Sequence, residues 1–266
     1  MPPLTEPSPD TPAHRARSPL VRTRHGRRTL EFLPGDVQSE MHLARPDALV
    51  LAYARAMMCF ALFVPRPRHI VMVGLGGGSL AKFCYRHFPG ARITVLELRA
   101  DVIALREQFH VPPDDARFRV IHADAADYIG RLAASADVLL VDGFDADGLP
   151  AALSSDAFYA NCRRTLRDGG VLVANIFNYD PRYPALLARV RRAFQGRVCQ
   201  FDRIAGNNHI LFAVKAPPHP EPGGPAAQAL RVHSLVAQRD GLGAGLANRL
   251  LARLLVAWLG RRGVCR

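Results

Sequence analysis

The sequence has few of the features that mark secreted, metal-binding or membrane proteins. Its five cysteines are odd in number and form no Cys-x-x-Cys pair, so neither a disulfide framework nor a zinc site is expected. The first residues are rich in proline and include acids, so we expect no signal peptide. The apolar run 48–64 contains Arg55 and is short for a transmembrane helix. These absences predict a reduced, cytoplasmic protein with no transmembrane segment and no metal.

Lysine is also scarce, because the chain has only Lys82 and Lys215. The formal net charge of +12 therefore comes almost wholly from arginine, and it concentrates at the two ends. Residues 1–30 hold six arginines against two acids, and residues 216–266 hold seven against two. Such ends could contact nucleic acid or an anionic membrane, although solvated arginine-rich tails have the same composition. We do not expect a nucleic-acid partner.

The length of 266 residues and the apolar content of 49% suit one α/β core with small additions. Turn chemistry at Pro34-Gly35-Asp36 predicts a hairpin, and the apolar density after Asp47 predicts a buried helix that runs to Phe63. The segments expected along the chain are a disordered tail (1–20), a β-hairpin and helix (28–64), a Rossmann-like domain (65–215), and a Pro/Gly linker with an amphipathic helix at Leu246–Leu259 (216–266).

The most informative stretch combines a strand, a glycine turn, a helix, a second strand and an acid. Ile70–Val73 is a short apolar run with β-branched residues, typical of a buried parallel strand. Four glycines follow within 74–78, and they allow a tight turn and close approach of a ligand to the backbone. Leu80–His87 predicts a helix, and Ile93–Leu96 predicts a strand that ends at Glu97, an acid that can accept hydrogen bonds from ribose hydroxyls. This pattern predicts a site for a nucleoside-type cofactor.

The glycine spacing favours S-adenosylmethionine or a relative over NAD. The dinucleotide fingerprint requires glycine at its first, third and sixth positions, whereas the sixth position here is Ser79. A sulfonium nucleoside has no pyrophosphate to place on the helix N-terminus, so the tighter Gly-x-Gly-x-Gly pattern suits it.

Alternating strands and helices continue to about residue 215, and they predict a doubly wound α/β sheet. Ligands of such sheets bind outside the carboxyl ends of the strands. Glu97, Asp124 and Asp142 all follow predicted strands, although each alone could be a loop residue or a helix cap. The further strands expected are Phe118–His122, Val138–Val141, Val171–Phe177, Val198–Ile204 and His209–Val214, the last two forming a hairpin around Gly206-Asn207-Asn208.

A combination of short motifs runs through this region. It comprises Val37-Gln38-Ser39, Tyr53, Gly74 to Gly78, Glu97, Asp124-Ala125, Val141-Asp142-Gly143-Phe144-Asp145, Leu153 with Phe158-Tyr159, and Leu166 with Gly169-Gly170. With these motifs the chain resembles the spermidine/spermine synthase (polyamine aminopropyltransferase) family over roughly residues 30–215. The resemblance implies a Rossmann-like sheet of the S-adenosylmethionine methyltransferase type behind a short N-terminal β-hairpin region.

The resemblance also implies roles for individual residues. Asp142 would be the catalytic carboxylate, and Tyr53 and Asp145 would lie near a small amine substrate. Glu97 would hold the ribose and Asp124 the adenine amine of decarboxylated S-adenosylmethionine or of S-adenosylmethionine itself. The full set expected to bind the cofactor is Gln38, Gly74, Gly76, Gly78, Glu97, Leu98, Asp124 and Ala125. We also expect a homodimer.

Two positions and one short stretch depart from the family pattern. Gly77 stands where the family has an aspartate that meets the amine of the decarboxylated donor, and Ala54 replaces a glutamine after the substrate tyrosine. Residues 142–146 read Asp-Gly-Phe-Asp-Ala where the family has Asp-Ser-Ser/Thr-Asp-Pro. Three hypotheses therefore stay open: an aminopropyltransferase-like enzyme, a methyltransferase that uses intact S-adenosylmethionine on a small molecule, and a non-catalytic nucleoside-binding protein.

Overall fold

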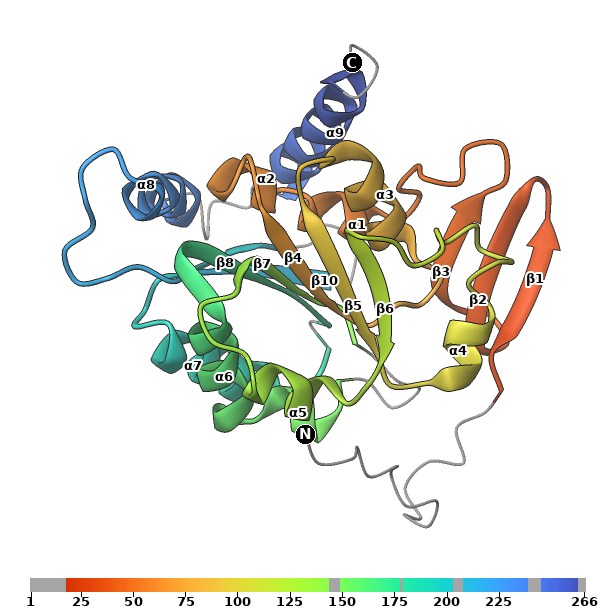
Figure 1. Cartoon of the computed structure of the whole chain (residues 1–266), viewed down its shortest axis with the longest axis horizontal. Helices are drawn as coiled ribbons and strands as arrows, with labels where there is room; N and C mark the ends of the chain where they lie inside the picture. Colours follow the sequence, from red (N-terminus) through yellow and green to blue (C-terminus); the bar gives the residue numbers. More distant parts are fainter. Residues whose placement is uncertain (1–17, 144–148, 178, 203–207, 239–244, 263–266) are drawn as a thin grey trace.

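The computed structural model describes residues 18–143, 149–177, 179–202, 208–238 and 245–262, apart from the side chain of Arg262. This part of the chain forms two β-sheets flanked by helices (Figure 1). The strands are β1 (Leu20–Arg24), β2 (Arg27–Leu33), β3 (Asp36–His42), β4 (His69–Val73), β5 (Arg92–Glu97), β6 (Phe118–His122), β7 (Ala136–Val141), β8 (Leu166–Phe177), β9 (Val198–Phe201) and β10 (Asn208–Val214). The helices are α1 (Ala52–Met57), α2 (Phe60–Phe63), α3 (Ser79–His87), α4 (Ala100–Ala104), α5 (Ala125–Gly130), the 3₁₀ helix η1 (Ala151–Ser154), α6 (Asp156–Thr165), α7 (Tyr183–Ala193), α8 (Pro225–Ala237) and α9 (Gly245–Arg262).

The larger sheet has the strand order β6-β5-β4-β7-β8-β10-β9. The strands from β6 to β8 are parallel, whereas β10 runs antiparallel to both β8 and β9. The chain starts this sheet in the middle at β4 and moves outward on each side in turn, which confirms the predicted doubly wound topology. Asn208, predicted in the turn of the closing hairpin, instead begins β10, and residues 203–207 of that turn lie outside the described residues.

Side chains that alternate along the strands form two apolar cores, one on each face of this sheet. Ile70 and Met72 of β4 pack into the first core, and Val71 and Val73 pack into the second. Helices α1, α2, α3, α8 and α9 cover the first face, and α5, α6 and α7 cover the second (Figure 1). A parallel strand that is buried on both faces requires an unbroken apolar run, which is why the sequence pattern locates β4 so well.

The N-terminal sheet has three strands where the sequence predicts a hairpin of two. β2 and β3 form the predicted hairpin, and β1 pairs with the outer edge of β2. His25 and Gly26 join β1 to β2 with φ angles of 48° and 72°, as in the two-residue turns that suit twisted antiparallel strands. The sequence does not reveal β1 because nearly all its residues are exposed and show no apolar alternation. Of the expected disordered tail, 1–20, only the end is described, where Leu20 begins β1.

The predicted helix 47–63 is wrong in its start and in its continuity. α1 begins only at Ala52, and Asp47 instead forms an ion pair with Arg86 of α3 at 2.5 Å. Between α1 and α2 the N–H of Cys59 bonds to the carbonyl three residues back, which tightens the chain and starts a new helical turn. Local apolar density predicts burial here correctly but does not reveal this break.

The C-terminal region contains a helix that the sequence reading missed. α8 begins at Pro225 inside the predicted linker, and proline suits a first helical position because no intrahelical partner exists for its missing N–H. α9 spans the predicted helix and packs Ala252 and Leu259 against the first core. Its outer side is also apolar and exposed, at Leu246, Leu250, Leu254 and Trp258.

None of the helices in the described ranges combines the length and apolarity that crossing a bilayer requires. The division of the chain into the four segments stays a prediction.

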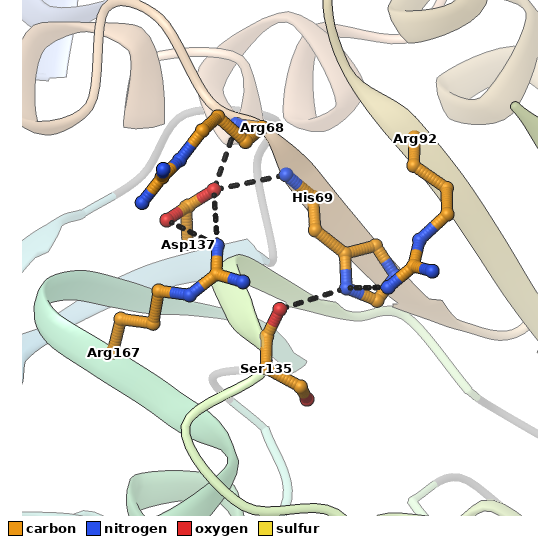
Figure 2. A network of polar contacts seen from close by, with 6 residues as sticks. All are labelled: Arg68, His69, Arg92, Ser135, Asp137 and Arg167. Carbon is orange, nitrogen blue, oxygen red and sulfur yellow. Dashed lines mark hydrogen bonds and ion pairs between the residues drawn. The ribbon is translucent and has the colours of Figure 1, made fainter.

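A polar network joins β4, β7 and β8 at the end of the sheet opposite to the glycine turn (Figure 2). Asp137 accepts hydrogen bonds from the backbone N–H groups of Arg68 at 2.7 Å and His69 at 2.9 Å, and forms an ion pair with Arg167 at 3.1 Å. His69 Nδ1 lies 2.9 Å from the carbonyl oxygen of Ser135. Arg92 Nη2 lies 3.1 Å from the same Nδ1 and can only donate, whereas a carbonyl can only accept, so the two contacts favour opposite tautomers of the imidazole.

Candidate active site

The glycine turn after β4 is held by the acid at the end of β5. Glu97 is buried, and its two carboxylate oxygens accept hydrogen bonds from the backbone N–H groups of Leu75 at 2.8 Å and Arg99 at 2.9 Å. The N–H of Gly74 bonds to the carbonyl of Leu96 at 2.8 Å. Glu97 therefore shapes the turn itself. Each carboxylate oxygen has a second lone pair, so the predicted ribose contact remains chemically available and stays a prediction.

Three glycines of the turn have positive φ angles, at Gly74 (91°), Gly76 (50°) and Gly78 (67°). A Cβ at Gly74 would lie 2.4 Å from the carbonyl oxygen of Asp142, and one at Gly78 would lie 2.4 Å from Val111 Cγ2. At Gly76 the nearest atom is Ser39 Cβ at 3.8 Å. Gly74 and Gly78 are therefore required by close packing, whereas Gly76 leaves room beside the backbone where a ligand could approach.

Gly77 lies on the crowded side of the turn, against β3. A Cβ at this position would lie 2.6 Å from Ser39 Oγ and 2.9 Å from Phe109 Cδ1. Ser39 Oγ is also 3.3 Å from Ser79 Oγ at the start of α3. Two hydroxyl groups thus occupy the neighbourhood of Gly77, and a larger side chain there would displace Ser39.

Asp142 follows β7 and lies directly beside the glycine turn. Its backbone N–H donates to the carbonyl of Val73 at 3.0 Å. Its carboxylate accepts hydrogen bonds from Asn175 Nδ2 at 2.9 Å and from the hydroxyl of Tyr53. Burial of this carboxyl group raises the pKa of Asp142, and the two hydrogen bonds oppose part of that rise. Among the residues that the structure describes, no ion pair to Asp142 is found.

Tyr53 comes from α1 and faces Asp142. Burial, the negative charge of Asp142 and the hydrogen bond to it together raise the pKa of Tyr53 well above the usual range, so the phenol keeps its proton and donates it. Tyr53 Oη also lies 3.5 Å from the carbonyl oxygen of Gln38, the outer limit of a hydrogen bond. The amide of Gln38 donates instead to Asp36 Oδ2 at 2.8 Å. The structure therefore brings the backbone of Gln38, rather than its amide, to Tyr53.

The predicted adenine side of the site lies after β6, next to Glu97. The N–H of Ala123 donates to the carbonyl of Glu97 at 3.0 Å, which holds this segment against the end of β5. Asp124 is the N-cap of α5 and accepts a hydrogen bond from the N–H two residues on, at 2.8 Å, while Ala125 is buried as the first residue of the helix. The side chain of Leu98 is 56% exposed and offers an apolar surface beside these acids. The roles assigned to all these residues stay predictions.

Sequence reasoning missed two amides that belong to this group. Asn175 of β8 contacts Asp142, and Asn208 of β10 donates to Asn175 Oδ1 at 2.8 Å. The signal that could have found Asn175 is a single amide inside the otherwise apolar run of its strand, because a buried amide needs partners. Asp145, expected beside the amine substrate, lies outside the described residues.

The arrangement suits proton transfer from a bound cationic substrate. A carboxylate with a raised pKa is a stronger base than an exposed one, and it lies at the carboxyl ends of parallel strands where ligands of this fold bind. No cluster of three histidine, cysteine or acidic residues that could hold a metal ion occurs in the described part of the chain.

Comparisons with known proteins agree with this geometry. The spermine/spermidine synthase domain model matches residues 50–180. A polyamine aminopropyltransferase from Neisseria meningitidis serogroup A is 37% identical over 193 residues, which is 72% of this chain and 73% of the relative. A probable spermidine synthase from Corynebacterium glutamicum has a similar fold, with a TM-score of 0.64 at 21% identity over 82% of this chain and 83% of that chain. Human methyltransferase-like protein 13, solved with SAH, gives a TM-score of 0.53 at 24% identity over 70% of this chain and 90% of that chain. The chain therefore belongs to the spermine/spermidine synthase family of transferases, on a methyltransferase-like fold.

Proposed function

We propose that this enzyme transfers an aminopropyl group from decarboxylated S-adenosylmethionine to a small amine, as a polyamine aminopropyltransferase. The observation that carries the proposal is Asp142, a carboxylate with a raised pKa beside the glycine turn, whose hydrogen-bond donors among the described residues are neutral. The family membership supports the same reaction.

The proposed chemistry requires a base, because an aliphatic amine is mostly protonated near neutral pH and cannot attack in that form. Asp142 would orient the ammonium group and accept its proton. The freed nitrogen then forms a bond to the methylene next to the sulfonium, the carbon–sulfur bond breaks, and methylthioadenosine leaves. Tyr53 would keep the carboxylate in place through its hydroxyl group. A positioned base of this kind contributes roughly 10²–10⁴ in rate.

The residues around the glycine turn suit an adenosyl donor. The open side of Gly76 lets a ligand approach the backbone, and the exposed side chain of Leu98 offers a surface for a purine ring. Glu97 and the free lone pairs of Asp124 could accept hydrogen bonds from ribose and adenine groups. The donor would supply the electrophilic carbon, and these residues would bind and orient it.

The direct test is incubation of the purified protein with putrescine and decarboxylated S-adenosylmethionine, followed by chromatographic detection of methylthioadenosine. We expect release that depends on both substrates. Absence of methylthioadenosine with an entire panel of diamines and polyamines would overturn the proposed reaction. The homodimer and the cytoplasmic location expected from the sequence also stay predictions, and light scattering and cell fractionation test them.

A second candidate is methyl transfer from intact S-adenosylmethionine, and the surroundings of Gly77 favour it. By resemblance, this position would carry the aspartate that meets the donor amine, but here Ser39 and Phe109 fill the space. The hydroxyl groups of Ser39 and Ser79 would not repel the carboxylate of the intact donor as an acid would. Calorimetry with both donors separates the two candidates, because tighter binding of the carboxylated donor would favour the methyltransferase.

A further inference from the structure

Three polar side chains lie side by side across three neighbouring strands of the large sheet. Asp142 follows β7, Asn175 is in β8 and Asn208 is in β10, and we refer to these three residues as the amide row. The parallel register pairs Val141 with Ala174, so the next pair along is Asp142 with Asn175. The antiparallel register pairs Asn175 with Ile210, so Asn208 is its diagonal neighbour. The register therefore places all three side chains on the face that carries α1.

The hydrogen bonds of the amide row have one direction. Asn208 Nδ2 donates to Asn175 Oδ1 at 2.8 Å, and Asn175 Nδ2 donates to Asp142 Oδ1 at 2.9 Å. The opposite orientation of the Asn175 amide would place its oxygen against a carboxylate oxygen, and two acceptors repel. The Asp142 carboxylate therefore selects the orientation in which Asn175 presents an N–H group, and the bond from Asn208 to Asn175 Oδ1 supports that orientation.

The two amides are costly to bury in this part of the sheet. Asn175 is 2% exposed and Asn208 is 7% exposed, and the residues that continue their strands on the same face, such as Val173 and Phe212, are fully buried. Burial of an amide is unfavourable unless its hydrogen bonds are made, so apolar residues would serve packing alone equally well. The hydrogen bonds that the amides donate, from Asn208 to Asn175 and from Asn175 to Asp142, therefore account for their presence better than packing does.

We propose that Asn175 and Asn208 are positioning residues, which hold the Asp142 carboxylate in a fixed orientation and favour its ionised form for proton transfer from the amine. The inference rests on the proposed function, because it assigns the amides to the base of that reaction. Around the carboxyl group, Asn175 donates from β8, and the titratable group that faces it in the described residues is Tyr53 from α1. The hydrogen bond from Asn175 lowers the pKa of Asp142 against the effect of burial.

The test replaces each amide with leucine, which has a similar volume but no donor. In Asn175→Leu we expect kcat/KM near neutral pH to fall about 10-fold, because a hydrogen bond to a charged group is lost. Protonation of Asp142 becomes easier, so the acidic limb of the pH profile should move to higher pH and the loss should shrink as pH rises. The KM for the donor should change little.

Asn208→Leu supplies a second, milder variant, because this residue does not touch the carboxylate. We expect a smaller shift of the acidic limb in the same direction. The double variant should lose no more than Asn175→Leu alone, since Asn208 acts only through Asn175. Asn248→Leu is the matched control, because Asn248 is also a buried amide (6% exposed) but lies on α9, outside the amide row. It should leave the acidic limb unchanged.

Infrared titration of the Asp142 carboxyl band, assigned by its disappearance in Asp142→Asn, separates this inference from the proposed function. The band should titrate at higher pH in Asn175→Leu than in the wild type, whether or not aminopropyl transfer is found. A protein that shows this shift but releases no methylthioadenosine would retain the inference on ionisation and lose the proposed reaction. An unchanged titration in both leucine variants, with thermal melts that show folded protein, would overturn the inference.

Discussion

The two ends of the large sheet hold their carboxylates in opposite ways. At the amino end, Asp137 receives two backbone N–H groups and the guanidinium of Arg167, so its negative charge is balanced (Figure 2). At the carboxyl end, the donors that Asp142 receives from the described residues are both neutral, Asn175 and Tyr53. Both acids tie strands together, and burial of the carboxyl group raises the pKa of Asp142.

This difference separates a structural acid from a chemical one. A carboxylate that bonds to a cation and to backbone N–H groups stabilises the fold, and these partners favour its ionised form. A carboxylate that is desolvated without a cation is held in a less favourable state, which makes it a better base and a natural partner for a cationic substrate. Replacement of Asp142 should therefore lower turnover, and replacement of Asp137 should lower the free energy of unfolding.

The largest expected effect is that of Asp142→Asn on turnover. The substitution keeps the shape of the side chain but removes the proton acceptor, so kcat should fall by about 10²-fold or more. Affinity for the donor should change far less, because the base acts mostly in the transition state. Steady-state kinetics and calorimetry measure the two quantities, and higher pH should partly restore turnover because more amine arrives deprotonated.

The stability of Asp142→Asn sharpens the same comparison. A carboxyl group whose pKa is raised by folding favours the folded state below its unfolded pKa and loses that contribution as pH rises through the folded value. At neutral pH the asparagine variant should thus be at least as stable as the wild type in thermal melts.

An Asp142→Asn protein that turns over normally but binds the donor poorly would contradict the assignment of Asp142 as the base, and Asp145 would be the next base to test.

Asp137→Ala should give the converse result. It removes the acceptor for two backbone N–H groups and the partner of Arg167, so we expect a loss of about 2–3 kcal/mol in the free energy of unfolding. The melting temperature should fall by about 2–4 °C for each kcal/mol in a domain of this size. Turnover per folded molecule should not change. Asp156→Ala, which removes exposed ion pairs to Arg189 and Arg192, is the control and should cost under about 1 kcal/mol. A selective loss of turnover in Asp137→Ala would break the comparison.

Gly74→Ala tests the backbone that carries the carboxyl end. The φ angle of 91° disfavours any side chain, and the new Cβ would meet the carbonyl oxygen of Asp142 at 2.4 Å. Strain of this kind costs about 1–3 kcal/mol, and relief by movement of Asp142 should lower activity as well. Gly90→Ala is the control, because open space surrounds that glycine, and it should leave stability and turnover nearly unchanged. Equal effects of the two alanine substitutions would show that the contact with Asp142 is unimportant.

Local patterns predicted the parts of this molecule that depend on neighbouring residues. The apolar run of β4, the glycines after it and Glu97 at the end of β5 are all visible within about thirty residues, so fold and turn follow from sequence alone. Edge strand β1 and helix α8 were missed because exposed polar residues and a Pro/Gly-rich approach give no periodic signal. The break between α1 and α2 depends on packing against the sheet, which apolar density does not reveal.

The site divides in the same way. That Asp142 and Glu97 lie at one edge follows from their positions after strands, and the structure places them there. The contact between Asn175 and Asn208 depends on the register of β8 with β10, which are separated by α7 and β9 in the chain, so sequence spacing does not predict it. Nor does sequence show that Glu97 accepts a hydrogen bond from Leu75 of the glycine turn, because this contact exists only once β4 and β5 pair, whereas its other bond, from the N–H of Arg99, is local.

The smallest expected effect concerns His69, on the amino side of the comparison. Its imidazole is placed between the Ser135 carbonyl, through Nδ1, and Thr94 Oγ1, 3.0 Å from Nε2. Burial has the largest effect and lowers the pKa of His69, while the hydrogen bond to Ser135 opposes it. The positive charges of Arg92 and Arg167 lower the pKa further, and Asp137 has the smallest effect, in the opposite direction. The folded protein therefore prefers the neutral imidazole.

The sign of the pH dependence follows from this preference. When folding depresses the pKa of a histidine, the unfolded chain binds more protons once the pH falls below about 6.5, so stability decreases as the solution is acidified. The melting temperature of the wild type should thus drop between about pH 7 and 5, and His69→Gln should drop less steeply because it cannot take up that proton. His87 and His233, which burial also shifts downward in pKa, would keep part of the slope in the variant. The difference between the two slopes isolates His69, whatever constant cost the substitution adds at every pH. Identical slopes would mean that the amino end of the sheet accepts a proton without loss, and its network would then be less rigid than its ion pair and hydrogen bonds imply.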